Sequence, residues 1–211
     1  HIALVASSIM SKKLASGADA IVLDVKCGDG SFNKTYEIAE KLAHQMVEIG
    51  DGVGKKTIAV ITNMEQPLGN AIGNSLEVIE AIETLKGKGN SELLEICLVL
   101  GTQMLLAGNY ANSKEDAENQ LKEAIQSGAA FDKFKQFIEI QGGDTSPISD
   151  YSKFAQASIT KNILENKSGY VSKLEAEKIG VASLILGAGR ETKESEIDLS
   201  AGIILHKKIG D

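Results

Sequence analysis

Residues that build disulfide frameworks and zinc sites are scarce in this sequence. It contains no tryptophan, two prolines, two cysteines and three histidines among 211 residues. Cys27 and Cys97 are too few and too far apart for a disulfide framework or paired metal ligands. His1, His44 and His206 share no metal-ligand spacing, so we expect no zinc site. Two unpaired cysteines are typical of free thiols in a reducing cytoplasm.

Long apolar runs and an excess of basic residues are also missing. No stretch of about 18 apolar residues occurs, and no basic segment precedes an apolar one at the start, so we expect neither a membrane span nor a secretory signal. The net charge is −7 and the basic residues are scattered, which argues against a nucleic-acid partner. With 43% hydrophobic residues, the chain can bury a core in one large or two small domains.

The hydrophobic pattern predicts an α/β fold with a mixed β-sheet flanked by helices. A β-α-β unit is indicated by a strand over 19–25, a helix over 34–49 and a second strand over 56–62. A helix over 2–15 precedes this unit, and Gly17 provides its C-cap. The other predicted elements are loops over 63–73 and 141–152, helices over 74–85, 91–107, 114–127, 129–140 and 175–186, and strands over 158–164, 169–174 and 201–205.

Two of these helices carry more detailed predictions. Asn74 is predicted to be the N-cap of the helix over 74–85. Ser91 is predicted to begin the helix over 91–107 with an incomplete capping box. Because that helix is apolar almost all round, we expect it to be buried, with its core positions at Cys97, Met104 and Leu105.

The helix over 2–15 combines an apolar stripe with a polar pair. Its apolar residues at helical spacing are Ile2, Val5, Ile9 and Met10. Ser8 and Lys12 are four residues apart and therefore share a face. A hydroxyl beside an ammonium group suits a neutral planar ligand rich in carbonyl acceptors. The spacing alone also fits two solvated surface groups.

The end of the first predicted strand offers a second candidate site. Asp24 and Lys26 lie at the carboxyl end of the strand, where the sites of α/β proteins collect. The glycine-rich segment 26–32 that follows could present backbone N–H groups to an anion. The acidic Asp29 would repel a phosphate, and a tight turn between strand and helix explains the two glycines equally well.

The loop over 63–73 offers a third candidate site. Hard monovalent cations are bound by oxygens, chiefly the free backbone carbonyls of irregular loops, together with a carboxylate that balances the charge. Glu77 and Glu80 on the following helix provide carboxylates. Taken alone, Glu80 is equally well interpreted as a solvated helix residue.

Several segments carry a resemblance to a known family. The string ASSIMSKKLASGADAIVLDVKCGDGSF resembles pyrimidine-nucleoside phosphorylases, which include the thymidine phosphorylases. These proteins carry S-I-x-x-K-K followed by G-x-D-A-x-V-x-D-V-K-x-G-x-G-x-F. Further similarity at NMEQPLGNAIGNSLEV and at KSGYV with IGVASLILGAGR extends the resemblance over nearly the whole chain.

The resemblance implies a role for each candidate site. Ser8 and Lys12 would grip the carbonyl and N–H edge of the pyrimidine base, with Lys12 as the catalytic residue. The carbonyls of Leu68 and Ala71 and the side chain of Glu80 would bind potassium. Asp24 and Lys26 would lie near the rim of the active-site cleft as weaker candidates.

The resemblance also implies the architecture and the activity. Residues 1–16 would belong to a separate all-helical lobe, 17–156 to an α/β domain, and 157–211 to a C-terminal α+β region. The reaction would be reversible phosphorolysis of uridine, thymidine or deoxyuridine to the free base and (deoxy)ribose 1-phosphate. This is pentosyl transfer in pyrimidine salvage, performed by a cytoplasmic homodimer.

Some of the family's pattern is missing from this sequence. The phosphate-binding Lys-His-Ser-Thr-Gly-Gly segment and the arginine that completes the base clamp do not occur, and the first residue, His1, is not an initiator methionine. We therefore expect a piece of a longer protein that is inactive alone. Two alternatives remain at this stage. One is a non-catalytic base-binding or dimerisation fragment. The other is a phosphoribosyltransferase of similar fold, for which we find neither acidic magnesium ligands nor a diphosphate loop.

Overall fold

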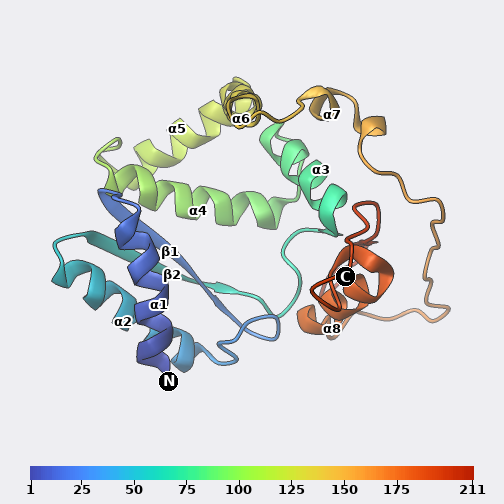
Figure 1. Ribbon diagram of the computed structural model, residues 1–211, viewed down its shortest axis with the longest axis horizontal. Coiled ribbons are helices and arrows are strands. Elements are labelled where there is room, and N and C mark those ends of the chain that lie inside the picture. Colours follow the sequence, from blue (N-terminus) through green and yellow to red (C-terminus); the bar gives the residue numbers. More distant parts are fainter. The chain divides into compact units, whose positions relative to one another are not determined.

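A computed structural model describes all residues from 1 to 211 and has the predicted α/β composition. The elements are α1 (Ile2–Ala15), β1 (Ala20–Cys27), α2 (Tyr36–Gly52), β2 (Lys56–Asn63), β3 (Ala71–Ile72), α3 (Asn74–Leu85), α4 (Ser91–Ala107), α5 (Lys114–Gln126), α6 (Ala129–Ile140), α7 (Ser146–Ser149), α8 (Ala176–Ser183) and β4 (Ile203–Ile204) (Figure 1). A 3-10 turn covers Tyr151–Lys153, and a π-helical turn covers Leu184–Ala188. None of the helices is long and apolar enough to cross a bilayer.

The chain forms two compact units. Unit 1 comprises His1–Glu65 and Leu94–Glu123, and unit 2 comprises Gln66–Leu93 and Ala124–Asp211. Each unit is a group of residues that contact one another more than they contact the rest of the chain. The domain boundaries after residues 16 and 156 stay a prediction.

Unit 1 is built on the predicted β-α-β arrangement. β1 and β2 are parallel, paired from Ala20 with Lys56 to Cys27 with Asn63. Because side chains alternate along a strand, β1 directs every second residue to the core. α1 and α2 cover this face (Figure 1). The buried core consists of Ala6, Met10, Ile21, Leu23, Val25, Ala39, Leu42, Ala43 and Met46.

The apolar stripe of α1 differs from the prediction by one position. Ala6 and Met10 are fully buried, whereas Val5 is 47% exposed. Placing Val5 in the stripe was therefore wrong. The small side chain of Ala6 fits where α1 packs against α2, and Met10 reaches Gly50 of α2, where an added Cβ would lie 3.2 Å from the Met10 methyl carbon.

The prediction that α4 is buried was also wrong. Only Thr102 and Ala107 are buried, while Cys97 is exposed and Met104 is 54% exposed. Hydrophobicity all round a helix favours burial, but burial needs packing partners on every side. In these 211 residues α5 covers part of α4, at Gly101, where an added Cβ would lie 3.0 Å from Leu121.

The starts of α3 and α4 correct two capping predictions. Asn74 is the first residue of α3, and Gly73 precedes it with a φ of 132°. The side-chain amide of Asn74 instead donates to the carbonyl of Ala188 at 3.0 Å. At α4 the side-chain oxygen of Asn90, not of Ser91, accepts from the amide of Leu93 at 3.1 Å.

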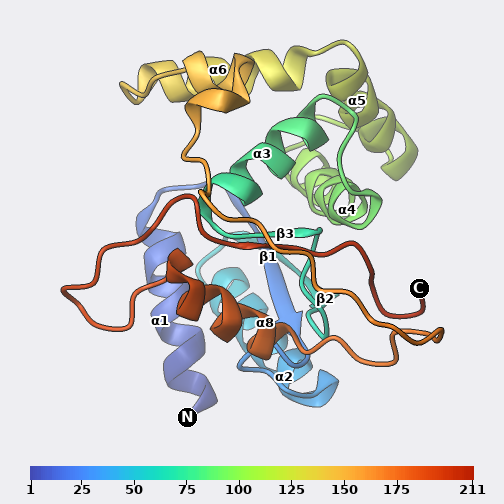
Figure 2. The same cartoon turned by 90° about the vertical axis from the view of Figure 1, so that its right-hand side faces the viewer.

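Unit 2 contains a small antiparallel ladder. Ala71 of β3 pairs with Ile204 of β4, and Ile72 pairs with Ile203. Figure 2 shows the C-terminal segment, in dark red, beside β3. The predicted strand over 201–205 is thus confirmed in a shortened form. The predicted loop over 141–152 contains α7 and the start of the 3-10 turn.

Strands over 158–164 and 169–174 were predicted and are absent. These segments have no strand assignment, and Ile159 and Ile163 are more than 80% exposed. A local run of β-branched residues favours extended backbone, but a strand also needs a hydrogen-bonding neighbour. Only Val171 exchanges backbone hydrogen bonds with the C-terminal residues Gly210 and Asp211, at 2.9 and 3.1 Å.

Candidate functional site

The polar pair on α1 lies open to solvent. Ser8 and Lys12 are both exposed, and their spacing of four places them on one face of the helix. The buried Ala6 and Met10 hold α1 on the core from its other side. Neither the Ser8 hydroxyl nor the Lys12 ammonium is engaged by another group of the chain, so both remain available to a ligand.

At the carboxyl end of β1, the structure brings Asp24 and Lys26 together. The Lys26 ammonium lies 2.8 Å from an Asp24 carboxylate oxygen, and the Thr62 hydroxyl donates to the other oxygen of that carboxylate. Thr62 was missed by sequence reasoning. Thr62 is the parallel-register partner of Lys26, a pairing that becomes visible only once the two strands are aligned in the structure. Asp24 and Lys26 therefore neutralise each other locally.

The same end of β1 adjoins α4. Although the Cys97 residue is exposed, its sulfur is partly shielded from water, which raises the pKa of the thiol, and the positive charge of Lys26 acts in the opposite direction. The thiol is therefore protonated at neutral pH and is not an activated nucleophile.

The turn after β1 is built for close backbone approach. Gly28 has a φ of 125°, and a Cβ there would lie 2.7 Å from the amide nitrogen of Glu65. The Met64 amide donates to the Cys27 carbonyl at 2.6 Å, and the Gly30 amide donates to the Met64 carbonyl at 2.9 Å. These contacts account for Gly28 by the geometry of a tight turn, the alternative that the sequence left open.

The third candidate site lies in unit 2, on the loop before β3. The Glu80 carboxylate accepts from the amides of Asn70 and Ala71, at 2.7 and 3.3 Å. Gly69 makes this approach possible, since a Cβ there would lie 2.2 Å from the Glu80 carboxylate. Glu80 is therefore directed at the loop, rather than solvated as a free helix residue.

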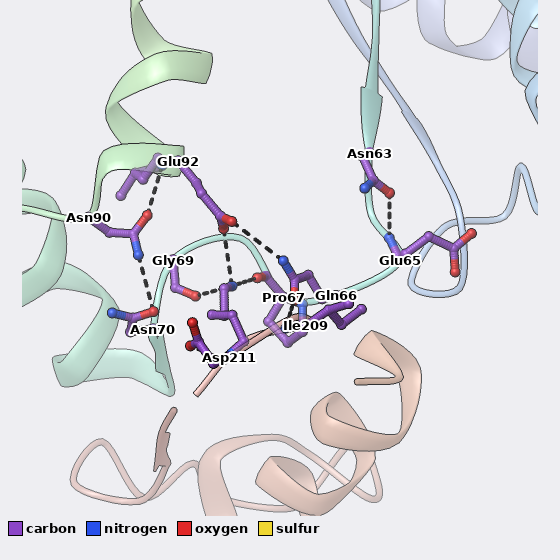
Figure 3. Close-up of polar contacts among 12 residues, drawn as sticks. Asn63, Glu65, Gln66, Pro67, Gly69, Asn70, Asn90, Glu92, Ile209 and Asp211 are labelled. Atoms are coloured by element: carbon purple, nitrogen blue, oxygen red, sulfur yellow. Dashed lines mark hydrogen bonds and ion pairs between the residues drawn. The ribbon is translucent and has the colours of Figure 1, made fainter. Parts of the chain in front are cut away.

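Lys208 approaches the same loop, and sequence reasoning missed it. Its ammonium donates to the carbonyls of Pro67 and Gly69, the second at 2.7 Å, and lies 3.4 Å from the Glu92 carboxylate (Figure 3). Only 13% of the Lys208 side chain is exposed. Nothing local in the sequence singles out this residue, because its partners lie more than 100 positions away along the chain.

The loop's remaining acceptors fit a monovalent cation. The Leu68 carbonyl, between the two that Lys208 holds, accepts no hydrogen bond within the chain. An ionised carboxylate has about four acceptor positions, so two amide donors leave Glu80 with capacity for an ion. No cluster of three or more His, Cys, Asp or Glu side chains occurs. Carbonyls with a single carboxylate suit a hard cation of low charge.

A cavity of about 480 Å³ adjoins the start of α3. It is lined by Gly73, Asn74 and Glu77 and, from α8 and the turn after it, by Ser183 and Gly189. The Glu77 carboxylate accepts from the Gly73 backbone amide at 3.0 Å. The Asn74 side-chain amide donates to the Ala188 carbonyl. These polar groups are therefore occupied in holding the turn.

Comparison with known proteins identifies the family. Residues 3–131 match the model of the glycosyl transferase family, a/b domain, and residues 170–211 match the pyrimidine nucleoside phosphorylase C-terminal domain. The chain belongs to this glycosyl transferase family. All candidate residues named from the sequence fall within the family's a/b domain, and Lys208 falls within the C-terminal match.

Named relatives extend the similarity over the whole chain. The pyrimidine-nucleoside phosphorylase of Staphylococcus haemolyticus is 57% identical over 210 residues, covering 100% of this chain and 48% of the relative. The protein of the same name from Staphylococcus aureus strain USA300 is 58% identical with the same coverage. The chain thus spans about half the length of the curated relatives it matches.

Proposed function

We propose that the protein to which these residues belong is a pyrimidine-nucleoside phosphorylase. It would transfer the pentosyl group of uridine, thymidine or deoxyuridine to phosphate, releasing the free base and (deoxy)ribose 1-phosphate. The observation that carries this proposal is the identity of 57–58% along the whole chain to relatives of that name. The exposed Ser8 and Lys12 of α1 support it, because they are free to meet a base.

Lys12 is the proposed catalytic residue. As the glycosidic bond breaks, negative charge builds on the departing pyrimidine. An ammonium at a base carbonyl is bound more strongly by that charge than by the neutral nucleoside, which lowers the barrier. Ser8 would hold the ring edge and help to reject bases without the matching pattern of donors and acceptors.

Potassium is the proposed cofactor of the loop before β3. The Leu68 and Ala71 carbonyls and the Glu80 carboxylate would hold it, and its charge would favour binding of the phosphate co-substrate. The free Leu68 carbonyl and the Glu80 contacts with the loop support this assignment. Asp24 and Lys26 are weaker candidates for the active site, since their ion pair holds the end of β1.

We also propose that the whole protein is a cytoplasmic homodimer. The exposed apolar side chains of α4, Val99 at 39% and Met104 at 54%, support further packing beyond these residues. Light scattering coupled to gel filtration of the full-length protein tests the dimer. A monomeric mass at micromolar concentration would contradict it.

The proposed activity is tested with two proteins. One is the 211-residue chain, and the other is a full-length chimaera in which these residues replace the matching region of the Staphylococcus aureus relative. Release of uracil from uridine and of thymine from thymidine is followed with and without phosphate and potassium. We expect phosphate-dependent release by the chimaera alone. A folded chimaera that binds uracil without turnover would instead favour a non-catalytic base-binding module.

A further inference from the structure

Lys208 is the most enclosed of the ion-paired cations of the chain. Its side chain is 13% exposed, against 29% for Lys86 and 31% for Lys26. Removing an ammonium from water is unfavourable unless acceptors replace the lost hydration. Two carbonyls and the Glu92 carboxylate do so here. An ammonium group has three donors, and these three acceptors match them.

Lys208 and Glu80 hold different sets of backbone groups in the loop. Pro67 and Gly69 direct their carbonyls to the ammonium, and the amides of Asn70 and Ala71 donate to Glu80. The Leu68 carbonyl belongs to neither set and is left free. The loop is therefore fixed by a cation from one segment and an anion from another, with one unused carbonyl between them.

Two other residues of the C-terminal segment also form hydrogen bonds with this loop. The Leu205 amide donates to the Asn70 carbonyl at 2.7 Å. The Ile209 amide donates to the side-chain oxygen of Gln66 at 3.0 Å (Figure 3). Lys208 thus lies between two further contacts with the same loop, which restricts where its ammonium can go.

We propose that Lys208 is a positioning residue for monovalent-cation binding. Its ammonium holds the Pro67 and Gly69 carbonyls so that the Leu68 carbonyl is presented, together with Glu80, to the ion. This inference rests on the proposed potassium site and goes beyond it by assigning a residue that is not itself a ligand. It predicts that cation affinity depends on a lysine from the C-terminal domain.

The test uses the full-length chimaera and three variants. Lys208→Met keeps the length of the side chain and removes its charge, and Lys208→Arg keeps the charge. Lys207→Met is the matched control, because the neighbouring Lys207 is exposed and its loss changes the net charge equally. The melting temperature is measured against potassium chloride at constant ionic strength, with a bulky organic cation as the replacement salt. A ligand that binds the folded state raises this temperature by mass action.

We expect Lys208→Met to raise the potassium concentration at half-maximal stabilisation by about 10-fold or more, as the loss of an outer-shell partner does at other metal sites. Lys208→Arg should recover part of this affinity, and Lys207→Met should leave it unchanged. The potassium dependence of uridine phosphorolysis should shift in parallel, with kcat restored at saturating potassium. Hydrogen exchange at the Asn70 and Ala71 amides should quicken in Lys208→Met, which reports loop order without reference to activity.

The outcomes separate this inference from the proposed function. If the unaltered chimaera responds to potassium and Lys208→Met shows the same affinity, or a tighter one, the role of Lys208 is wrong and the potassium site stands. If the unaltered chimaera shows no potassium response, both are wrong. If Lys208→Met does not fold, Glu92→Gln serves in its place. It removes the charge that holds the ammonium and should weaken potassium binding in the same direction.

Discussion

Individual charged residues of this chain differ in what holds them. Lys12 is exposed and free, Lys26 is paired with Asp24 at 2.8 Å, and Lys208 is enclosed by three acceptors. A free surface cation contributes little to folding stability, because water solvates it equally well in the unfolded chain. Lys12 is therefore not needed to hold the fold, whereas Lys26 and Lys208 have partners within the chain.

Replacing Lys12 by methionine in the full-length chimaera should reduce kcat for uridine phosphorolysis by about 100-fold or more, the scale of losing one transition-state donor. The melting temperature should stay unchanged, since the side chain is exposed. Steady-state kinetics and thermal unfolding measure the two effects. Lys13→Met is the control, because Lys13 is exposed on the same helix and should leave kcat unaltered. Equal losses in both variants would contradict the assignment to Lys12.

Elements with a periodic pattern were predictable, and those that depend on distant partners were not. The bounds of α1, α3, α4 and α6 match their predictions because apolar runs and the turn-forming residues that flank them are local features of the sequence. The strands expected within 158–174 are absent because no neighbouring strand pairs with them. At the candidate sites, Ser8, Lys12 and Glu80 were named through the family resemblance, and their roles stay predictions. Lys208 could not, since 139 residues separate it from Gly69.

Packing of α1 on the core gives a stability prediction. Met10 is fully buried among α1, α2 and β1, so Met10→Ala removes its apolar contacts and leaves a cavity. The free energy of unfolding should fall by about 2–5 kcal/mol. Urea denaturation of the chain measures it, with Leu4→Ala as control, because Leu4 is 72% exposed on the same helix. A similar loss in both variants would show that α1 does not pack through Met10.

Contacts at the end of α3 predict that the stability of the fold depends on pH. The Tyr151 hydroxyl donates to Glu83, and Lys86 donates to the Tyr151 hydroxyl at 2.8 Å while lying 5.2 Å from the centre of the Phe131 ring on α6. The hydrogen bond from Tyr151, followed by that from Lys86, lowers the pKa of Glu83 below its usual 4.5. The stabilisation is therefore present above pH 4.5 and is lost as the pH falls through the lowered folded-state value.

Tyr151→Phe should consequently lower the melting temperature at neutral pH, with the difference from the unaltered chain narrowing below pH 4.5. Thermal unfolding across this range measures it. Tyr170→Phe is the control, since Tyr170 is 86% exposed and should leave the curve unchanged. A difference that stays constant with pH would show that Tyr151 does not act through the Glu83 carboxylate.

Across the whole chain, the two candidate sites belong to different units. The polar pair of α1 belongs to unit 1, and the loop with Glu80 and Lys208 belongs to unit 2. Each site is held by its own unit's packing: α1 by Ala6 and Met10, and the loop by contacts from α3, α4 and the C-terminal segment. In the proposed reaction, unit 1 would supply the base contacts and unit 2 the cation.

The fate of phosphate distinguishes phosphorolysis from simple hydrolysis of the nucleoside. The full-length chimaera is incubated with uridine and inorganic phosphate, and the reaction is followed by phosphorus NMR together with uracil release. We expect ribose 1-phosphate to appear in equal amount to uracil, the reverse reaction to run from those two products, and both reactions to depend on Lys12. Uracil released without a sugar phosphate, or no reaction from a folded chimaera, would contradict it.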